Sequence, residues 1–194
     1  MNIYFNASLA GKEKYLKEFR EIISIIEDLG HMVYSDHVMK RDAENINRQI
    51  RKYHELDFRR ARNEIQKSDA MVVEATYPSI GVGHTMTIAL EMHKSVFVLY
   101  QNEPHGLLVG DPNRLLFLKK YKPEDNQELK NIIKGFLERV NKRVLKKRFN
   151  LMIDEMEEEY LEWKSKKRKI SKADCIRQLI DDNLRKDKDY DNFS

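Results

Sequence analysis

The chain has 194 residues, of which 35% are charged, yet 36 basic against 32 acidic side chains leave a net charge of only +4. This balance does not by itself indicate a nucleic-acid partner, although most of the basic excess lies beyond residue 140. A single cysteine, Cys175, excludes an internal disulfide framework and a multi-cysteine metal site, and no metal or cofactor is expected. The opening MNIYF has no basic region, and no run approaches the about 20 apolar residues of a membrane span. We therefore expect a cytoplasmic protein.

Short apolar or β-rich runs alternate with helical patterns along the first 140 residues. The expected strands are 3–5, 32–34, 70–75, 96–100 and 115–118, and the expected helices are 12–29, 42–67, 83–93 and 124–140. Strands separated by helices imply a parallel sheet that is covered on both faces. The sequence therefore predicts an α/β fold with a five-stranded, doubly wound parallel sheet, similar to the flavodoxin and Rossmann architectures.

The stretch 74–90, EATYPSIGVGHTMTIAL, joins an expected buried strand to an expected helix. Its turn contains Ser79, Gly81 and Gly83. Such a turn can direct backbone N–H groups, the positive end of the helix dipole and a hydroxyl at one point, which suits a phosphate or another small anion. The same glycines are equally compatible with a plain tight connection.

Polar residues follow the ends of several expected strands. In open parallel sheets ligands bind beyond the carboxyl ends of the strands, where Asn6, Ser8, Asp36 and His37 would converge on the turn at 74–83. Each has a structural alternative, because Asn6 and Ser8 also suit turns, and Asp36 and His37 can cap a loop.

Two residues of the central stretch have alternatives of their own. Glu74 ends a hydrophobic strand, and a carboxylate there is costly to bury without a partner. It should therefore either accept hydrogen bonds from the N–H groups of the turn or face the pocket. His84 is either a ligand contact or a partly exposed histidine.

Three segments carry a family resemblance: EATYPSIGVGH, the opening IYFNASLAG, and SDHV at 35–38. Over residues 1–140 the chain resembles the nucleoside 2-deoxyribosyltransferase-like superfamily, in particular the branch of 2'-deoxynucleoside 5'-monophosphate N-glycosidases. The resemblance implies that the turn binds a 5'-phosphate and that the loop at 8–11 lies near the sugar or base. The expected nucleotide contacts are Asn6, Ser8, Gly11, His37, Ser79, Gly81, Gly83 and His84.

The chain departs from this family at both catalytic carboxylates. The resemblance places the nucleophilic Glu at Thr85 and the second carboxylate, an Asp, at Ala61. A carboxylate can form a covalent glycosyl intermediate, whereas an unactivated Thr hydroxyl is a poor nucleophile without charge. Asp57 and Glu64 flank Ala61 at about one helical turn, so these two residues and Glu74 are candidate substitutes.

The character of the chain changes beyond residue 140. A basic linker at 141–147 precedes strict apolar and polar alternation at 148–153, which predicts a half-buried strand. Asp154 with Glu157, and Ser171 with Asp174, each have the spacing of a capping box that starts a helix. One strand and two helices bury too little surface to fold alone, so we expect pairing with a second chain.

The segment 148–187 resembles the ribbon-helix-helix fold, in which two chains pair their strands, and the tail at 188–194 is expected to fray. In DNA-binding members of that fold the ribbon enters the major groove. The resemblance places Arg148, Asn150 and Met152 at base edges, with Ser171 and Lys172 at a phosphate. The alternative is a ribbon that only dimerises.

Three interpretations follow. The first is a ligand-responsive regulator that binds a nucleotide without cleaving it and forms a homodimer or higher homo-oligomer, with or without double-stranded DNA. The second is an active deoxynucleotide N-glycosidase or deoxyribosyltransferase with a relocated carboxylate. The third is an oligomeric scaffold with a vestigial pocket.

Overall fold

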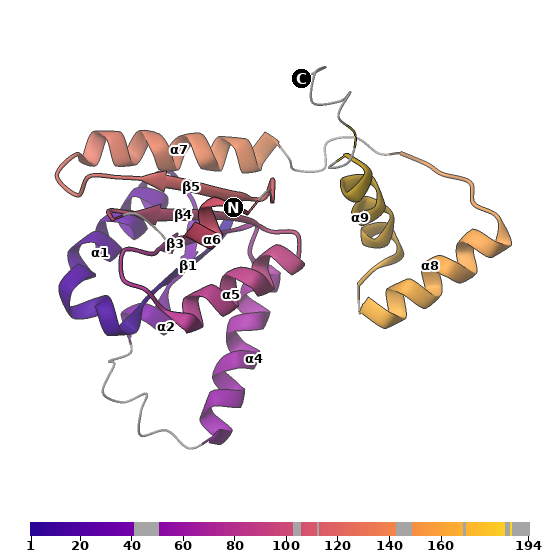
Figure 1. The fold of residues 1–194 in the computed structure, drawn as a ribbon, viewed down its shortest axis with the longest axis horizontal. Coiled ribbons are helices and arrows are strands. Elements are labelled where there is room, and N and C mark those ends of the chain that lie inside the picture. The colour runs from indigo at the N-terminus through magenta and orange to yellow at the C-terminus, as the bar shows by residue number, and fades with distance from the viewer. Residues whose placement is uncertain are drawn as a thin grey trace. The chain divides into compact units, whose positions relative to one another are not determined.

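The structure is a computed structural model that describes residues 1–40, 51–102, 106–111, 113–142, 149–168, 170–184 and 187. The chain divides into two compact units, Met1–Val144 and Leu145–Ser194 (Figure 1). None of the helices in the described ranges has the length and apolar character that a membrane crossing requires.

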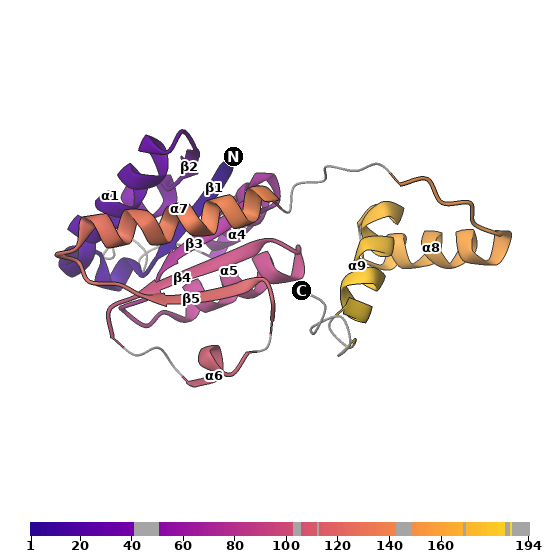
Figure 2. The ribbon, with the colours of Figure 1, turned by 90° about the horizontal axis from the view of Figure 1, so that it is seen from above.

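The first unit is built on a five-stranded sheet (Figure 2). Its strands are β1 (Asn2–Ala7), β2 (Met32–Tyr34), β3 (Ala70–Glu74), β4 (Ser95–Tyr100) and β5 (Leu116–Lys120). They lie in the order β2-β1-β3-β4-β5, and every neighbouring pair is parallel. The predicted fold class of this unit is therefore confirmed. The strand order reverses beside β1 and β3, and ligands of doubly wound sheets bind at such a switch point.

Helices lie between successive strands, and one more helix follows the last strand. They are η1 (Leu9–Gly11), α1 (Lys12–Asp28), α2 (Asp36–Met39), α4 (Arg51–Lys67), α5 (Ile80–Glu91), α6 (Gly106–Val109) and α7 (Asn126–Lys142). The helix predicted at 42–67 is observed as α4, and its expected first part at 42–50 lies outside the described residues. Helix α5 begins three residues earlier than the prediction of 83–93, because Ser79 caps it and both glycines lie within its first turn.

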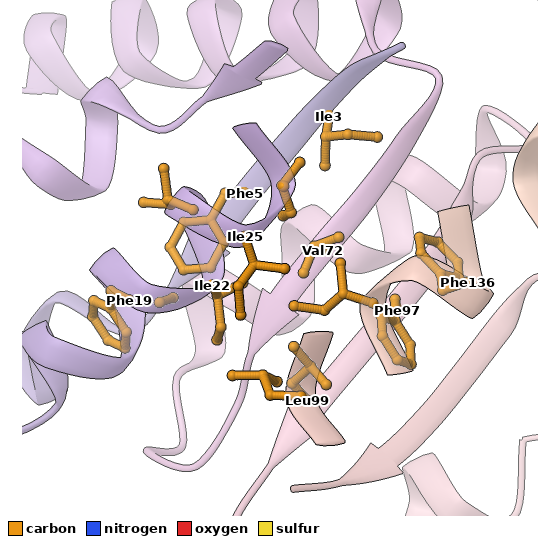
Figure 3. Close-up of a cluster of buried hydrophobic side chains, with 14 of the residues drawn as sticks. Ile3, Phe5, Phe19, Ile22, Ile25, Val72, Phe97, Leu99 and Phe136 are labelled. Carbon is orange, nitrogen blue, oxygen red and sulfur yellow. The ribbon is translucent and has the colours of Figure 1, made fainter. Parts of the chain in front are cut away.

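The sheet has an apolar core on each face. On one face Ile3, Phe5 and Val72 pack against α1 and α7 (Figure 3). On the other face Tyr4 and Met71 pack against α4 and α5. Because side chains alternate along a strand, this division also fixes the direction of the polar residues at the strand ends.

The second unit contains two helices, α8 (Glu155–Arg168) and α9 (Lys172–Leu184). Both predicted helix starts are observed, the first with a complete capping box and the second with its N-cap bond. The Glu157 N–H donates to Asp154 Oδ1 at 2.8 Å, and the Asp154 N–H donates to Glu157 Oε2 at 3.0 Å. At α9 the Asp174 N–H donates to Ser171 Oγ at 3.0 Å. The two helices pack together, and Leu161 and Cys175 are buried apolar side chains of this unit.

The segment before α8 differs from the strand predicted at 148–153. Residues 149–153 form no strand in the single chain, and residue 148 lies outside the described residues. A lone strand has no partner for its N–H and C=O groups, so a ribbon of this kind requires a second chain. The ribbon-helix-helix interpretation stays a prediction.

Candidate functional site

The residue at the predicted nucleophile position is held by two hydrogen bonds. Asn6 leaves β1 on the sheet face covered by α4 and α5, and its Nδ2 donates to Thr85 Oγ1 at 2.7 Å. The Thr85 hydroxyl in turn donates to the Val82 carbonyl at 2.8 Å. A general base that activates a nucleophile must accept the proton of that hydroxyl. Here a backbone carbonyl accepts it, so the Thr85 hydroxyl is not activated.

The amino end of α5 lies in the same region. Ser79 is the N-cap, and its Oγ accepts a long hydrogen bond of 3.4 Å from the Val82 N–H. The first N–H groups of any helix have no partner within the helix. Gly81 and Gly83 are exposed, so no side chain of their own covers this end of a 12-residue helix. The arrangement suits an anion, as the sequence predicts.

The loop after β1 packs closely on the turn before α5. Gly11 is buried, and a Cβ atom on it would lie 2.6 Å from the Cβ of Tyr77. Ser8 is also buried, and its carbonyl accepts from the Gly11 N–H at 3.1 Å. The absence of a side chain at position 11 thus permits the contact that sets the turn. Sequence reasoning assigned Gly11 to the ligand and missed Tyr77.

Glu74 hydrogen-bonds the turn from the face of the sheet that α1 and α7 cover, opposite to the face of Thr85. Its Oε1 accepts from the Thr76 N–H at 3.3 Å, from the Thr76 hydroxyl, and from the Tyr121 hydroxyl at 3.1 Å. Tyr121 belongs to the core beside α1 and α7, whereas Thr85 lies on the α4 and α5 side. Of the two alternatives for Glu74, bonding to the N–H groups of the turn is therefore the one observed.

Burial governs the ionisation of Glu74. The side chain is 1% exposed, and this desolvation raises the pKa of its carboxyl group, although the hydrogen bonds from Thr76 and Tyr121 act against the rise. Its Oε2 is buried without a hydrogen-bond partner. The hydrogen bonds from Thr76 and Tyr121 hold this carboxyl group on the face of the sheet away from Thr85, and this geometry favours a structural role for Glu74.

The region of the second predicted carboxylate is apolar. Ala61 packs against the core on the α4 and α5 face. One turn further along α4, Glu64 accepts from Arg60 Nε at 2.9 Å, and its Oε2 lies 3.8 Å from His37 Nδ1. Asp57, one turn before Ala61, is partly buried. Of the candidate substitutes, Glu64 thus lies close to His37, and Arg60 forms an ion pair with it.

The predicted histidines both stack on aromatic rings. The ring of His37 lies parallel to that of Tyr4, with centroids 4.5 Å apart and an angle of 6° between the rings. His84 is exposed and stacks on Phe58 with centroids 5.9 Å apart, which links α5 to α4. An open hollow of about 550 Å³ lies beside this pair, lined by His54, Glu55, Phe58 and Arg59.

Asp36 is engaged with basic side chains. Lys40 Nζ donates to Asp36 Oδ2 at 2.8 Å, and this hydrogen bond lowers the pKa of the Asp36 carboxyl group. Arg60 lies 4.0 Å from the same oxygen. Arg60 thus lies between Asp36 and Glu64, and Glu64 also lies near His37. Spacing along the sequence does not reveal this arrangement.

The residues predicted to contact DNA lie in the second unit. Asn150 and Met152 are exposed, and Arg148 lies outside the described residues. The Ser171 hydroxyl donates to Asp174 Oδ2 at 2.7 Å, and Lys172 Nζ lies 3.0 Å from Glu158 Oε1. Both groups expected at a phosphate are therefore engaged by carboxylates.

The fold and site together define an α/β protein in which the amino end of a helix lies at the switch point of a parallel sheet. No family model matches the chain. It is 33% identical over 136 residues to a protein of Nematostella vectensis, covering 66% of this chain and 89% of the relative. It is 31% identical over 137 residues to a protein of Methanosarcina barkeri, covering 70% and 84%. Both are named "Putative 2'-deoxynucleoside 5'-phosphate N-hydrolase 1".

The chain therefore belongs to the 2'-deoxynucleoside 5'-phosphate N-hydrolase family. A relative from Danio rerio, named 5-hydroxymethyl-dUMP N-hydrolase, is 26% identical over 151 residues, covering 73% of this chain and 99% of the relative. Among solved structures, the CMP N-glycosidase BcmB of Clostridium botulinum matches with a TM-score of 0.52 and 15% identity. That match covers 70% of this chain and 99% of the other, and it shows a shared fold. The predicted superfamily is thus confirmed.

Proposed function

We propose that the first unit binds a 2'-deoxynucleoside 5'-phosphate, or a closely related nucleotide, and that it cleaves the glycosidic bond poorly or not at all. The observation that carries the proposal is the hydroxyl of Thr85, which stands where the resemblance places a nucleophilic Glu and donates to the Val82 carbonyl. Family membership supports the nucleotide ligand.

The open amino end of α5 supports binding of the 5'-phosphate. A phosphate there would accept from the first N–H groups of the helix, with the Ser79 hydroxyl beside them. Asn6 and His37 lie at the ends of the neighbouring strands, where the sugar and base of a nucleotide on this turn would extend.

The missing carboxylates support impaired cleavage. Glycosidic cleavage passes through an oxocarbenium-like transition state, which an adjacent carboxylate stabilises or captures covalently. Thr85 and Ala61 offer no negative charge. Glu74 is enclosed on the other face of the sheet. We infer that a bound nucleotide meets a site that holds the phosphate but does not stabilise positive charge at the first carbon of the sugar.

Binding and cleavage are measured separately. Thermal unfolding is followed with deoxynucleoside 5'-phosphates and with the matching nucleosides that lack phosphate. A specific ligand at 100 times its Kd stabilises the folded state by about 2.7 kcal/mol. We expect stabilisation by the phosphorylated compounds alone and no base release by chromatography. No stabilisation by any nucleotide would favour the scaffold with a vestigial pocket, and base release at enzymatic rates would refute the proposal.

One observation favours the second candidate, an active N-glycosidase with Glu64 as the relocated carboxylate. Glu64 lies one turn from Ala61 on α4, with His37 3.8 Å away. If the protein releases base, Glu64→Gln should abolish the release, while the matched change Asp57→Asn should leave it intact. Equal activity of the two variants would exclude this relocation.

For the second unit we propose a role in pairing two chains, with DNA contact as a secondary possibility. The exposed alternating residues Phe149 and Leu151 support pairing. Asp174 and Glu158, which engage Ser171 and Lys172, compete with a DNA phosphate for these groups and disfavour DNA binding. DNA binding through this unit should weaken steeply with salt and lose sequence preference in Asn150→Ala. If neither salt nor Asn150→Ala changes DNA binding, the predicted ribbon is not the contact.

A further inference from the structure

One side of α8 presents an uncovered apolar stripe within the second unit. Met156, Tyr160 and Trp163 are 77%, 47% and 54% exposed, and their spacing of four and three residues places them on one face of the helix. Leu161, by contrast, is buried in the contact between α8 and α9. The residues Met156, Tyr160 and Trp163 are called the α8 stripe below. The packing of α9 leaves this stripe open.

Charge is divided between the two halves of α8. The amino half carries Glu155, Glu157, Glu158 and Glu159, and the carboxyl half carries Lys164, Lys166, Lys167 and Arg168. Such a division complements the helix dipole of a single helix. It also makes the helix self-complementary, because an antiparallel second copy would bring each acidic half against a basic half.

Several of these charges are available to a partner. Glu155 and Glu159 form no ion pair with any described residue, whereas Glu162 is already paired with Lys166 at 2.7 Å. Lys167 Nζ lies over the Trp163 ring, 4.7 Å from its centroid, so a positive charge accompanies the carboxyl end of the stripe. Glu159, next to Tyr160 in the chain, lies on the flank of the same face, whereas Glu158 pairs with Lys172 of α9 at 3.0 Å.

We propose that the α8 stripe is covered by the α8 stripe of a second copy of this chain, with the two helices antiparallel and the twofold axis near Tyr160. Helix α8 has 14 residues, about 21 Å in length. In this register Met156 of one copy lies opposite Trp163 of the other, and Glu155 lies near Lys166 and Lys167. The acidic half disfavours nucleic acid and anionic lipid surfaces as occupants, since both are negatively charged.

This contact is distinct from the pairing predicted for residues 148–153, and it does not depend on nucleotide binding by the first unit. The alternating segment precedes the helix, whereas the stripe runs along it. Trp and Tyr bury large areas at low conformational cost and are enriched at the centres of interfaces. Truncating Trp163 to Ala should therefore weaken the association of the two helices at least tenfold.

Disulfide trapping in the full-length chain tests the register. In a Cys175→Ala background, which removes the natural thiol, single cysteines replace Met156, Tyr160 or Trp163. A disulfide requires Cα atoms about 4.4–6.8 Å apart. We expect Tyr160→Cys to form a symmetric disulfide dimer, and Met156→Cys and Trp163→Cys to cross-link only when mixed. Glu162→Cys, on another face of the same helix, is the matched control and should not cross-link.

Charge reversal tests the complementarity, with the Tyr160→Cys dimer yield as the readout. A chain that carries both Glu155→Lys and Glu159→Lys should form less dimer with itself. A second chain that carries both Lys166→Glu and Lys167→Glu should also form less dimer with itself. An equimolar mixture of the two chains should recover the dimer. Failure of Tyr160→Cys to cross-link would overturn the proposal. The proposal would also be overturned if Leu151→Asp lowered the dimer yield while no charge reversal changed it, because the contact would then lie in the alternating segment.

Discussion

The contact between Gly11 and Tyr77 gives a quantitative prediction for Gly11→Ala. The backbone at Gly11 has φ −88° and ψ −6°, which alanine adopts without strain, so only the added methyl group matters. That methyl carbon would lie 2.6 Å from Cβ and 2.8 Å from Cγ of Tyr77. Both atoms are at the root of the side chain, so the backbone of the turn must move to relieve the clash.

The size of the effect follows from this geometry. Overpacking a well-filled site costs about 1–3 kcal/mol. For a chain of this size each kcal/mol corresponds to about 2–4 °C in Tm. We therefore expect Gly11→Ala to lower Tm by roughly 2–12 °C. Because Ser79 lies two residues after Tyr77, the displaced turn should also weaken nucleotide binding.

Thermal unfolding with and without nucleotide measures both effects, and Gly83→Ala is the matched control. A Cβ on Gly83 meets nothing within 4 Å. Gly83 lies within α5, where alanine is favoured over glycine by about 1 kcal/mol, so this control should keep or raise Tm. Tyr77 is 41% exposed, and Tyr77→Gly, which removes both the Cβ and the Cγ atom, should recover part of the stability in the Gly11→Ala background, whereas Tyr77→Ala keeps the Cβ contact and should not. A Gly11→Ala protein as stable as the Gly83→Ala control would refute the steric reasoning.

Three further variants test other parts of the site. Burial raises the pKa of Glu74, so the native state holds the carboxyl proton more tightly than the unfolded chain does. The stability that this proton contributes is fully present below the unfolded pKa of about 4.5 and is lost as the pH rises through the native pKa. Glu74→Gln should therefore gain Tm over the natural protein progressively with pH in melts from pH 4 to 9, and a constant difference would contradict this. Ser79→Ala removes a long capping bond and should cost about 0.5–1 kcal/mol together with a loss of nucleotide affinity, whereas unchanged affinity would count against the phosphate turn. Thr85→Val leaves Asn6 Nδ2 without an acceptor and should cost about 1 kcal/mol in denaturant unfolding; a neutral result would mean that the bond to Asn6 is not formed in solution.

The sequence predicted those features that depend on local pattern. The alternation of apolar runs and amphipathic stripes located all five strands and the main helices of the first unit. Both helix starts of the second unit were found from three-residue spacing. The strand-to-helix turn at Ser79 was located for the same reason, because glycine and serine at such a junction act through the local backbone, and its binding of an anion stays a prediction.

The features that sequence reasoning missed depend on contacts between distant residues. Tyr121 reaches Glu74 across the sheet, and 47 positions separate them in the chain. The stacking of His37 on Tyr4 likewise joins two separate elements, α2 and β1. No periodic signal marks such pairs. The direction of Glu74, away from the predicted catalytic face, follows from strand alternation only after the burial of each face is known.

The most direct test of the central claim is the rate of base release from saturating 2'-deoxynucleoside 5'-phosphate by three proteins: the natural chain, Thr85→Glu and the matched Thr85→Gln. Restoring a carboxylate should raise the rate at least 100-fold over the natural chain, since only Glu can stabilise or capture the developing cation, while Gln should give no gain. Release by the natural chain with a kcat near or above 1 per second, unchanged or lowered in Thr85→Glu, would contradict the account.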